Sequence, residues 1–297
     1  MQLSEPLFWK EYELIDTGDY EKLERFGSYI VRRPEPQAVW RKSLDESVWT
    51  AEANAFFKKE KGKNAMDGND RGEWICKKGM PDRWFIRYQY KEMQLSFRLA
   101  LTSFKHVGIF PEQADNWNFI YDSIQSFKEK ESPVLNLFAY TGGASLAARS
   151  AGAEVTHVDS VKQVLTWSRE NMESSGLENI RWVVEDVLKY CRREVKRGKK
   201  YAGIILDPPA YGRGPDGEKW ILEENIAELM SLCSELLREK EAFLILNLYS
   251  MGFSSVIAEN LIKDYFQDIS STEFGELVIP EQSGKRLPLS VYARFRR

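Results

Sequence analysis

The fold of this chain is indicated by Val134-Leu-Asn-Leu-Phe-Ala-Tyr-Thr-Gly-Gly143. The first half of this stretch, residues 134–138, is a short apolar run of the kind that forms a buried strand. Gly142 and Gly143 let the backbone turn sharply and approach a ligand closely, and the small residues at 143–151 predict a helix. A strand, a glycine turn and a helix in this order indicate a site for a nucleoside-type ligand, because the first N–H groups of the helix are free to face it.

Strands and helices alternate along the rest of the chain. Short apolar segments are followed by amphipathic ones, and this alternation predicts a parallel sheet with helices on both faces. The last two strands have no helix between them, which predicts one antiparallel strand at the end of the sheet. The predicted strands are residues 134–138, 154–159, 180–184, 201–206, 242–248, 269–279 and 290–295, and the predicted helices are 114–127, 143–151, 161–174, 187–196, 222–238 and 254–266.

The first third of the chain has a different composition, which changes near residue 105. It is rich in aromatic side chains and is interrupted by prolines and glycines. Residues 93–99 alternate between apolar and polar side chains, as in a half-buried strand. We therefore predict a small β-rich N-terminal domain over residues 1–105 and a larger α/β domain over residues 106–297. The other N-terminal predictions are strands at 29–32, 73–76 and 83–88, a short helix at 49–59 and a loop at 58–70.

The overall composition is that of an ordinary globular protein, with 297 residues of which 43% are hydrophobic and 29% charged. No apolar run approaches the roughly 20 residues of a membrane-spanning helix, and the start lacks the features of a secretory signal. The three cysteines are far apart and the histidines number two, so we expect neither disulfides nor a metal site, in a reduced, cytoplasmic protein. The net charge of −3 argues against a strongly basic nucleic-acid binder, although a local patch can still contact RNA phosphates.

Acidic residues follow the predicted strands. Open α/β sheets bind ligands beside the carboxyl ends of their strands, so these residues are candidates for the site. Asp159 ends the second strand, about 20 residues after the glycines, where an acidic side chain suits a ribose hydroxyl pair. Glu185 and Asp186 follow the third strand, and one of them, together with the Val187 backbone, suits an adenine ring. The acidic residues at both positions could instead cap the helices that follow them. The glycines and Asp159 by themselves fit a nicotinamide dehydrogenase nearly as well as a methyltransferase.

The segment Asp207-Pro208-Pro209 after the fourth strand selects the chemistry. Two prolines fix the backbone and remove two N–H donors, which leaves carbonyl groups and a carboxylate to face one spot. Such a site can hold a nitrogen nucleophile by its hydrogens and aim it at a sulfonium methyl group, and in-line methyl transfer depends on positioning. Hydride transfer has no such need, and the dinucleotide fingerprint G-x-G-x-x-G is absent from the sequence. We therefore expect a methyltransferase that uses S-adenosylmethionine rather than a dehydrogenase.

Longer segments around these residues carry a family resemblance. They are Phe104-Lys-His-Val-Gly-Ile-Phe-Pro-Glu-Gln113 followed by Asn116-Trp117, Leu135-Asn-Leu-Phe-Ala-Tyr-Thr-Gly-Gly143, and Ile205-Leu-Asp-Pro-Pro-Ala-Tyr211. Together they resemble the class I S-adenosylmethionine-dependent methyltransferase family that includes the bacterial 23S ribosomal RNA methyltransferases. The closing Lys285-Arg-Leu-Pro-Leu-Ser-Val-Tyr-Ala-Arg-Phe295 is similar to shorter, mostly uncharacterised members.

The resemblance implies a Rossmann-like fold with a seven-stranded, mostly parallel sheet and a small N-terminal β domain. It also implies that residues 106–113 lie against the methionine part of the cofactor and that the acceptor is RNA. The N-terminal RNA-binding domain of some larger members has no evident counterpart here, which leaves ribosomal RNA open as the substrate. The residues expected to bind the cofactor are His106, Gly108, Phe110, Gln113, Asn136, Phe138, Ala139, Tyr140, Thr141, Gly142, Gly143, Asp159, Ser160, Glu185, Asp186, Val187 and Asp207.

The acceptor atom is constrained by the absence of a suitable cysteine. Enzymes that methylate cytosine at C5 attack the base with a thiolate, and in related enzymes that cysteine follows the fourth or fifth strand. Here those positions read Pro209-Ala210-Tyr211 and Leu248-Tyr249-Ser250. We therefore predict transfer to a nitrogen or other heteroatom, with Asp207, Pro208, Pro209 and Tyr211 as catalytic residues. Base stacking by Tyr211 is a hypothesis, because Ala210 separates it from the prolines.

Several features have two interpretations. His106 fits either an acid–base group or a packed side chain, and His157 lies inside a strand, as a structural residue does. The basic run at 192–200 fits RNA phosphates or a solvated helix end. The N-terminal aromatics at 74–88 fit a core or a base-stacking platform. Alternative functions are a methyltransferase that acts on a protein or small molecule, and an RNA-binding module with a vestigial cofactor pocket. No oligomeric state is indicated.

Overall fold

The computed structural model describes residues 1–6, 9–60, 71–129, 131–249, 253–269 and 271–297. Its main feature is an eight-stranded sheet. In spatial order, the strands are β1 (Gln2–Ser4), β16 (Glu273–Pro280), β17 (Arg286–Arg296), β15 (Phe243–Leu248), β12 (Gly203–Leu206), β9 (Pro133–Leu137), β10 (Glu154–Asp159) and β11 (Ile180–Val184). Strand β17 runs antiparallel to both of its neighbours, and the other pairs are parallel. The predicted seven-stranded, mostly parallel sheet is confirmed, and β1 adds an eighth strand that was not predicted.

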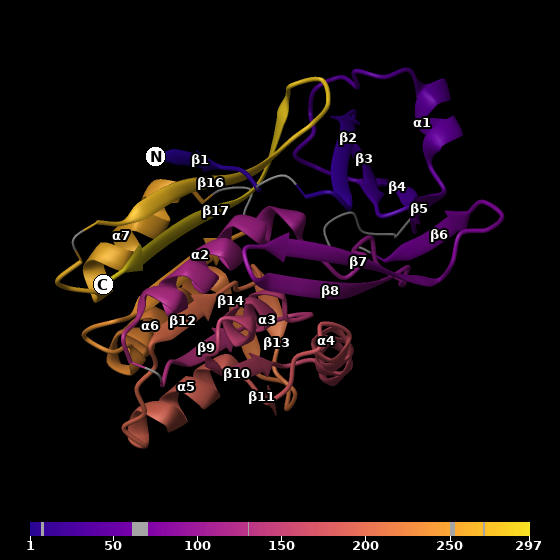
Figure 1. Ribbon diagram of the computed structural model, residues 1–297. Helices are drawn as coiled ribbons and strands as arrows, with labels where there is room; N and C mark the ends of the chain where they lie inside the picture. Colours follow the sequence, from indigo (N-terminus) through magenta and orange to yellow (C-terminus); the bar gives the residue numbers. More distant parts are fainter. Residues whose placement is uncertain (7–8, 61–70, 130, 250–252, 270) are drawn as a thin grey trace.

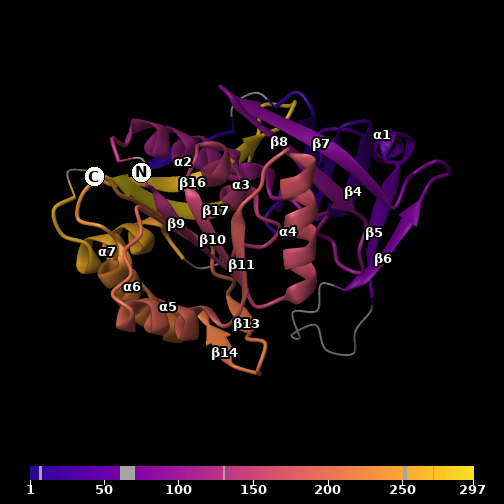
Figure 2. The ribbon, with the colours of Figure 1, turned by 60° about the horizontal axis from the view of Figure 1, so that its bottom comes forward.

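Helices cover both faces of this sheet (Figures 1 and 2). Residues next to each other in a strand serve opposite faces, since Leu244 packs with the core under α5, α6 and α7 while Ile245 packs with the core under α2 and α3. This explains why the strands read as continuous apolar runs. The helices are α2 (Ala114–Ser126), preceded by a 3-10 turn at Pro111–Gln113, α3 (Gly143–Ser150), α4 (Lys162–Ser174), α5 (Val187–Lys196), α6 (Leu222–Leu236) and α7 (Ser255–Tyr265).

The N-terminal region is rich in strands, as the sequence predicted. A five-stranded sheet and a long hairpin lie on one side of the large sheet in Figure 1. The sheet consists of β2 (Tyr12–Gly18), β3 (Glu21–Phe26), β4 (Tyr29–Pro34), β5 (Ala55–Lys59) and β6 (Gly72–Cys76), and the hairpin of β7 (Arg83–Tyr90) and β8 (Met93–Ala100). A second, short hairpin in the C-terminal part consists of β13 (Tyr211–Arg213) and β14 (Lys219–Ile221), at the bottom edge in Figure 2.

The predicted helix at 49–59 is wrong in its second half. Helix α1 (Glu46–Glu52) is short, and β5 follows it after two residues. Strand β5 pairs with β4 on one side and β6 on the other, and Phe57 packs edge-on against Trp74 at 5.3 Å between ring centroids. Sheet pairing therefore overrides the local helical tendency. The predicted loop at 58–70 is also wrong at its start, where Lys58 and Lys59 end β5, and residues 61–70 lie outside the described residues.

The N-terminal hairpin shares a core with the large sheet. The ring of Trp117 on α2 contacts Tyr88 at 5.4 Å and Phe97 at 5.1 Å between centroids, and all three side chains are buried. Strand β1 also belongs to the large sheet. The N-terminal residues therefore support the large sheet as well as a sheet of their own, and the domain boundary at residue 105 stays a prediction.

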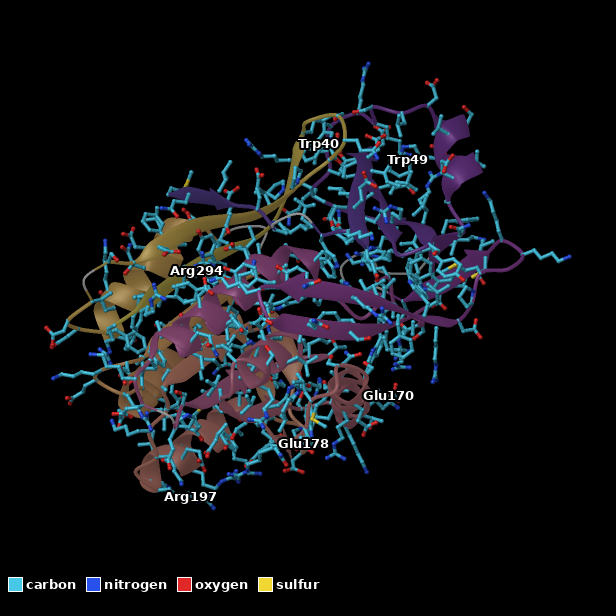
Figure 3. The ribbon with its side chains drawn as sticks, viewed as in Figure 1. Trp40, Trp49, Glu170, Glu178, Arg197 and Arg294 are labelled. Atoms are coloured by element: carbon cyan, nitrogen blue, oxygen red, sulfur yellow. The ribbon has the colours of Figure 1, made fainter. Side chains whose placement is uncertain are left out.

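A buried arginine on β17 fixes the start of α2. Arg294, labelled in Figure 3, donates to Asp115 Oδ2 at 2.7 Å and to Asn116 Oδ1 at 2.9 Å. It also pairs with Glu273 and lies over the Phe119 ring at 4.6 Å. These contacts satisfy a guanidinium that is only 7% exposed. They hold the segment that carries Gln113 and Asn116 against the carboxyl end of the sheet.

Candidate active site

Two adjoining cavities lie at the carboxyl ends of the parallel strands, where the sequence predicted a ligand. The larger, about 530 Å³, is lined by residues that follow β10, β11 and β12, and we call it the main cavity. The smaller, about 50 Å³, lies under the glycine turn, and we call it the tail cavity. They share Phe110, Phe138, Tyr140 and Asp207. The structure brings every predicted site residue to the lining of one or both cavities, except Gly108 and Pro208.

The glycine turn is built as its sequence requires. Gly142 has a φ of +92° and caps the start of α3, a conformation that other residues rarely adopt. At Gly143 a Cβ atom would lie 2.7 Å from the Trp117 ring, so a larger residue has no room there. The backbone of this turn and the N-terminus of α3 border the tail cavity, where N–H groups suit an anionic group such as a carboxylate.

An amide cluster forms another wall of the tail cavity. Gln113 Oε1 accepts from Asn116 Nδ2 at 2.9 Å and from Asn247 Nδ2 at 3.2 Å. Gln113 Nε2 is left without a partner, although the residue is only 8% exposed. Buried donors are normally paired, so this orphaned donor fits an acceptor group on a ligand. The cavity therefore suits the carboxylate of a methionine moiety.

Helix α4 ties the glycine turn to the N-terminal hairpin. The buried Asn171 on α4 donates from Nδ2 to the Thr141 carbonyl at 2.9 Å and accepts at Oδ1 from the Arg98 N–H at 2.8 Å. Thr141 Oγ1 in turn donates to the Gly108 carbonyl at 2.7 Å. The ligand-facing turn is therefore held from two sides by buried hydrogen bonds.

Asp159 is fixed at the end of β10. Its Oδ2 accepts from the Tyr140 N–H at 3.0 Å and its Oδ1 from the Val161 N–H at 2.9 Å. A carboxylate offers about four acceptor positions, so Asp159 keeps acceptor capacity for ribose hydroxyls in the main cavity. Burial raises the pKa of Asp159, and the backbone hydrogen bonds oppose that rise.

Glu185 and Asp186 both line the main cavity, but their carboxylates already accept hydrogen bonds from other residues of the protein. Arg193 holds Glu185 through two bonds of 2.5 and 2.6 Å, and Asp186 caps α5 by accepting from the Lys189 N–H at 2.9 Å. The cap interpretation of Asp186 is therefore confirmed. The bidentate pair leaves Glu185 less free to contact an adenine ring than the sequence suggested.

Asp207 provides the carboxyl group among the four residues that the two cavities share. Its Oδ1 is buried without a hydrogen-bond partner. Burial, together with the nearby Glu112 carboxyl, raises the pKa of Asp207 to about 7. A carboxyl with this pKa changes charge near neutrality, a property that is common at sites of proton handling.

The residues after Asp207 fold back into the β13–β14 hairpin. The Pro209 carbonyl accepts from Trp220 Nε1 at 2.7 Å, and the Ala210 carbonyl accepts from the Leu222 N–H. The expectation that both proline carbonyls face the ligand is therefore corrected for Pro209. Pro208 is buried outside the cavities. Tyr211, 54% exposed, lines the main cavity.

Within residues 106–110, some side chains line the main cavity, whereas Gly108 supports it from outside. The Phe110 ring lies 5.3 Å from His106 and Tyr140 and 5.7 Å from Tyr249, and these four side chains line the main cavity. Gly108 instead packs against the Trp167 ring, where a Cβ atom would overlap the ring, and its φ is +102°. Gly108 therefore shapes the site without lining it.

We expect Gly108→Ala to destabilise the protein more than Gly152→Ala does. Gly152 has a similar φ of +95° but no atom within 4 Å of a Cβ position, so its substitution costs only backbone strain of about 1 kcal/mol. Gly108→Ala adds overpacking of roughly 1–3 kcal/mol. Urea unfolding of both variants measures the difference, and equal free energies of unfolding would contradict this packing role.

The other candidate groups do not line the cavities described above. Cys191 and Cys233 are buried, burial contributes to a raised pKa of the exposed Cys76, and none of the three lines a cavity described above. His157 is buried beside Ser145, and burial lowers its pKa to about 3. Within the basic run, Arg192, Arg193 and Arg197 pair with glutamates, and Arg197 lies at the far end of α5 in Figure 3.

Among the described residues we find no cluster of metal ligands and no helix long and apolar enough to cross a membrane.

The structure adds residues that sequence reasoning missed. Glu112 is 2% exposed and accepts from the Tyr249 hydroxyl at 2.9 Å. Asn247 belongs to the amide cluster, and Trp220 packs on Phe138 at 4.7 Å. Asn247 and Tyr249 stand at the end of the fifth predicted strand, so the strand-end rule applied to polar and aromatic residues there would have found them.

Comparison with known proteins agrees with this geometry. A family described as "Conserved hypothetical protein 95" matches residues 110–250. The solved structure of a SAM-dependent methyltransferase from Agrobacterium tumefaciens is 35% identical, with a TM-score of 0.90 over 100% of this chain and 93% of that one. The chain belongs to the S-adenosylmethionine-dependent methyltransferases. S-adenosylmethionine is therefore its cofactor, and the orphaned Gln113 donor, the close-packed Gly143 and the oriented Asp159 fit that molecule.

Two further relatives bear on this methyltransferase. A putative SAM-dependent methyltransferase from Streptococcus mutans is 18% identical with a TM-score of 0.69, over 96% of this chain and 75% of that one, which shows the fold. The ribosomal RNA large subunit methyltransferase K/L of Shewanella frigidimarina is 30% identical over 151 residues, or 50% of this chain. The matched part is only 20% of that relative's length.

Proposed function

We propose that this methyltransferase transfers its methyl group to RNA, at a nitrogen or another heteroatom, in the cytoplasm. The observation that carries the proposal is the unpartnered Oδ1 of Asp207, at the junction of the main and tail cavities. The names of curated relatives that match this chain, the ribosomal RNA large subunit methyltransferases K/L and I, support RNA as the acceptor. The exposed Tyr211 and the ring of Phe110 are suited to stack an unpaired base.

Each part of the site has a role in this proposal. The cofactor, when bound, supplies an electrophilic methyl group on a sulfonium centre. Gln113 Nε2 and the N-terminus of α3 hold the methionine carboxylate, Asp159 holds the ribose hydroxyls, and Asp186 with Val187 borders the adenine. The Asp207 carboxylate accepts a hydrogen bond from the acceptor nitrogen and can take up the proton that this nitrogen loses. Positioning then supplies much of the rate.

The proposed acceptor atom is not cytosine C5. That reaction needs a cysteine thiolate at the base, and Cys76, Cys191 and Cys233 lie away from the cavities. Mass spectrometry of nucleosides from RNA methylated by the protein tests this point. We expect a nitrogen- or oxygen-methylated nucleoside, and 5-methylcytosine as the product would overturn the proposal.

We expect kcat for methyl transfer to rise about tenfold between pH 6 and pH 8. Asp207 is active as a carboxylate, and its pKa is about 7, so its charged fraction increases over this range. Glu112 and Tyr249 face the same region, and the raised pKa of the Tyr249 hydroxyl keeps it neutral here. Single-turnover rates at saturating cofactor measure the profile. A flat profile would remove Asp207 from proton handling.

A further inference from the structure

A third cavity adjoins the site on its N-terminal side. Its volume is about 360 Å³, and we call it the side cavity. It shares His106, Phe110, Ala210 and Tyr249 with the main cavity, so the two cavities adjoin at these residues. Most of its remaining wall comes from β3, β4 and the segment after β4, with Lys22, Arg33 and Gln37 among the lining residues. The N-terminal region therefore reaches the neighbourhood of Asp207.

Two cations of the side cavity, Lys22 and Arg33, already face carboxylates. Lys22 lies 3.0 Å from Glu35 and 3.8 Å from Glu24, and Arg33 donates to Glu24 at 2.5 and 3.0 Å. Lys22 and Arg33 are 6% and 3% exposed, and Glu24 is fully buried. Because the charges of Lys22 and Arg33 are balanced within the protein and Glu112 adds a further carboxyl group, the cavity is poorly suited to a phosphate. It is better suited to a neutral polar group of the acceptor.

Glu112 supplies the acceptor group of the side cavity. It lines this cavity and accepts the Tyr249 hydroxyl hydrogen bond at 2.9 Å. Burial raises the pKa of Glu112, and the Lys22 and Arg33 charges oppose that rise and favour the carboxylate. Glu112 also affects the charge of Asp207. Each of the two adjoining cavities is thus lined by one carboxyl group, Asp207 in the main cavity and Glu112 in the side cavity.

We propose that the side cavity receives a base of the RNA next to the acceptor nucleotide, stacked on Phe110 or Tyr249, with Glu112 accepting hydrogen bonds from N–H groups of this flanking base. The inference rests on the proposed function and names its substrate site. A base that leaves its stack is normally read by aromatic contacts and hydrogen bonds to its edge, and the cavity is large enough for it. The N-terminal strands β3 and β4 then form part of the substrate site.

The first test removes the carboxylate of Glu112. Glu112→Gln keeps the size of the side chain but presents an amide N–H to the base, so we expect KM for RNA to rise about 10- to 100-fold. The matched control is Glu194→Gln, since Glu194 is also buried and accepts a tyrosine hydroxyl, from Tyr201 at 2.9 Å, but lies on α5. The probe is unmethylated total RNA with labelled cofactor. Calorimetry with S-adenosylhomocysteine should give an unchanged Kd for both variants.

The second test fills the side cavity from the N-terminal segment without touching the buried charges. Gln37 is half-buried and lines the cavity, whereas Val39 is 66% exposed and does not line it. We expect Gln37→Trp to raise KM for RNA at least about tenfold by steric exclusion, and Val39→Trp to leave it unchanged. This pair keeps the inference testable if Glu112→Gln fails to fold.

The outcomes separate the two proposals. Methyl transfer to RNA by the unmodified protein, with raised KM in both cavity variants, supports the side cavity as the site of the flanking base. Transfer to RNA with KM unchanged in Gln37→Trp overturns the inference and leaves the proposed function standing. If the unmodified protein binds S-adenosylhomocysteine but transfers no methyl group to RNA, the proposed function fails, and the inference fails with it.

Discussion

Asp207→Asn is expected to lower kcat for methyl transfer by at least about 100-fold while the Kd for S-adenosylhomocysteine changes by less than about threefold. The carboxylate contacts the acceptor nitrogen in our proposal, and loss of a charge-assisted interaction made mainly in the transition state costs about 3 kcal/mol. Its Oδ1 has no partner within the protein, so the substitution breaks no hydrogen bond there. Single-turnover kinetics and calorimetry on the same preparation measure the two quantities.

The stability of the Asp207→Asn protein provides an internal control for folding. The folded state holds the pKa of Asp207 at about 7, above its ordinary value near 3.8, so the charged form is disfavoured on folding. The contribution of Asp207 to the free energy of unfolding of the wild-type protein is therefore fully present below pH 4 and is lost as the pH rises through 7. The variant should gain up to about 4 kcal/mol over wild type at pH 8, measured without ligands. Equal losses of kcat and cofactor affinity would contradict the role of Asp207.

Asp159→Ala is expected to weaken S-adenosylhomocysteine binding by about 100-fold or more. The carboxylate is proposed to accept both ribose hydroxyls, and hydrogen bonds to a charged group contribute roughly 1.5–3 kcal/mol each. The substitution also releases the Tyr140 and Val161 N–H groups, which now hold Asp159 in place. Calorimetry measures the Kd directly.

Asp159→Asn serves as the matched variant because it keeps the size and one acceptor oxygen. We expect its Kd to lie between those of wild type and Asp159→Ala. Wild-type affinity in Asp159→Ala, with an unchanged thermal midpoint, would show that the ribose is bound elsewhere.

The large sheet was predictable from sequence because its strands are buried on both faces and therefore read as apolar runs. Leu244 and Ile245 illustrate this, since they serve opposite cores. The N-terminal errors have the opposite cause. Residues 55–59 become a strand only through pairing with β4 and β6. Likewise β1 has three residues and is defined by its contact with β16, about 270 positions away.

The site was predictable where chemistry follows directly after a strand. The glycine turn, Asp159 and Asp207 were found in this way, and all line the cavities. Hydrogen bonds between site residues and residues distant in the sequence were not predictable. Arg193 pairs with the Glu185 carboxylate, and Trp220 donates a hydrogen bond to the Pro209 carbonyl. These contacts form only in the folded chain. Glu112 lies within one of the segments that carry the family resemblance, but its burial next to Tyr249 depends on contact between two segments that are far apart in the sequence.

The most direct test of the proposed function is a labelled-methyl transfer assay with the purified protein. Total RNA, ribosomal subunits and a protein extract are offered separately, with Asp207→Asn as the control, and modified nucleosides are identified by mass spectrometry. We expect label in RNA or ribosomal subunits, sensitive to ribonuclease, on a nitrogen- or oxygen-methylated nucleoside, and almost none with Asp207→Asn. Label confined to the protein extract, or label in RNA undiminished by Asp207→Asn, would contradict the proposed function.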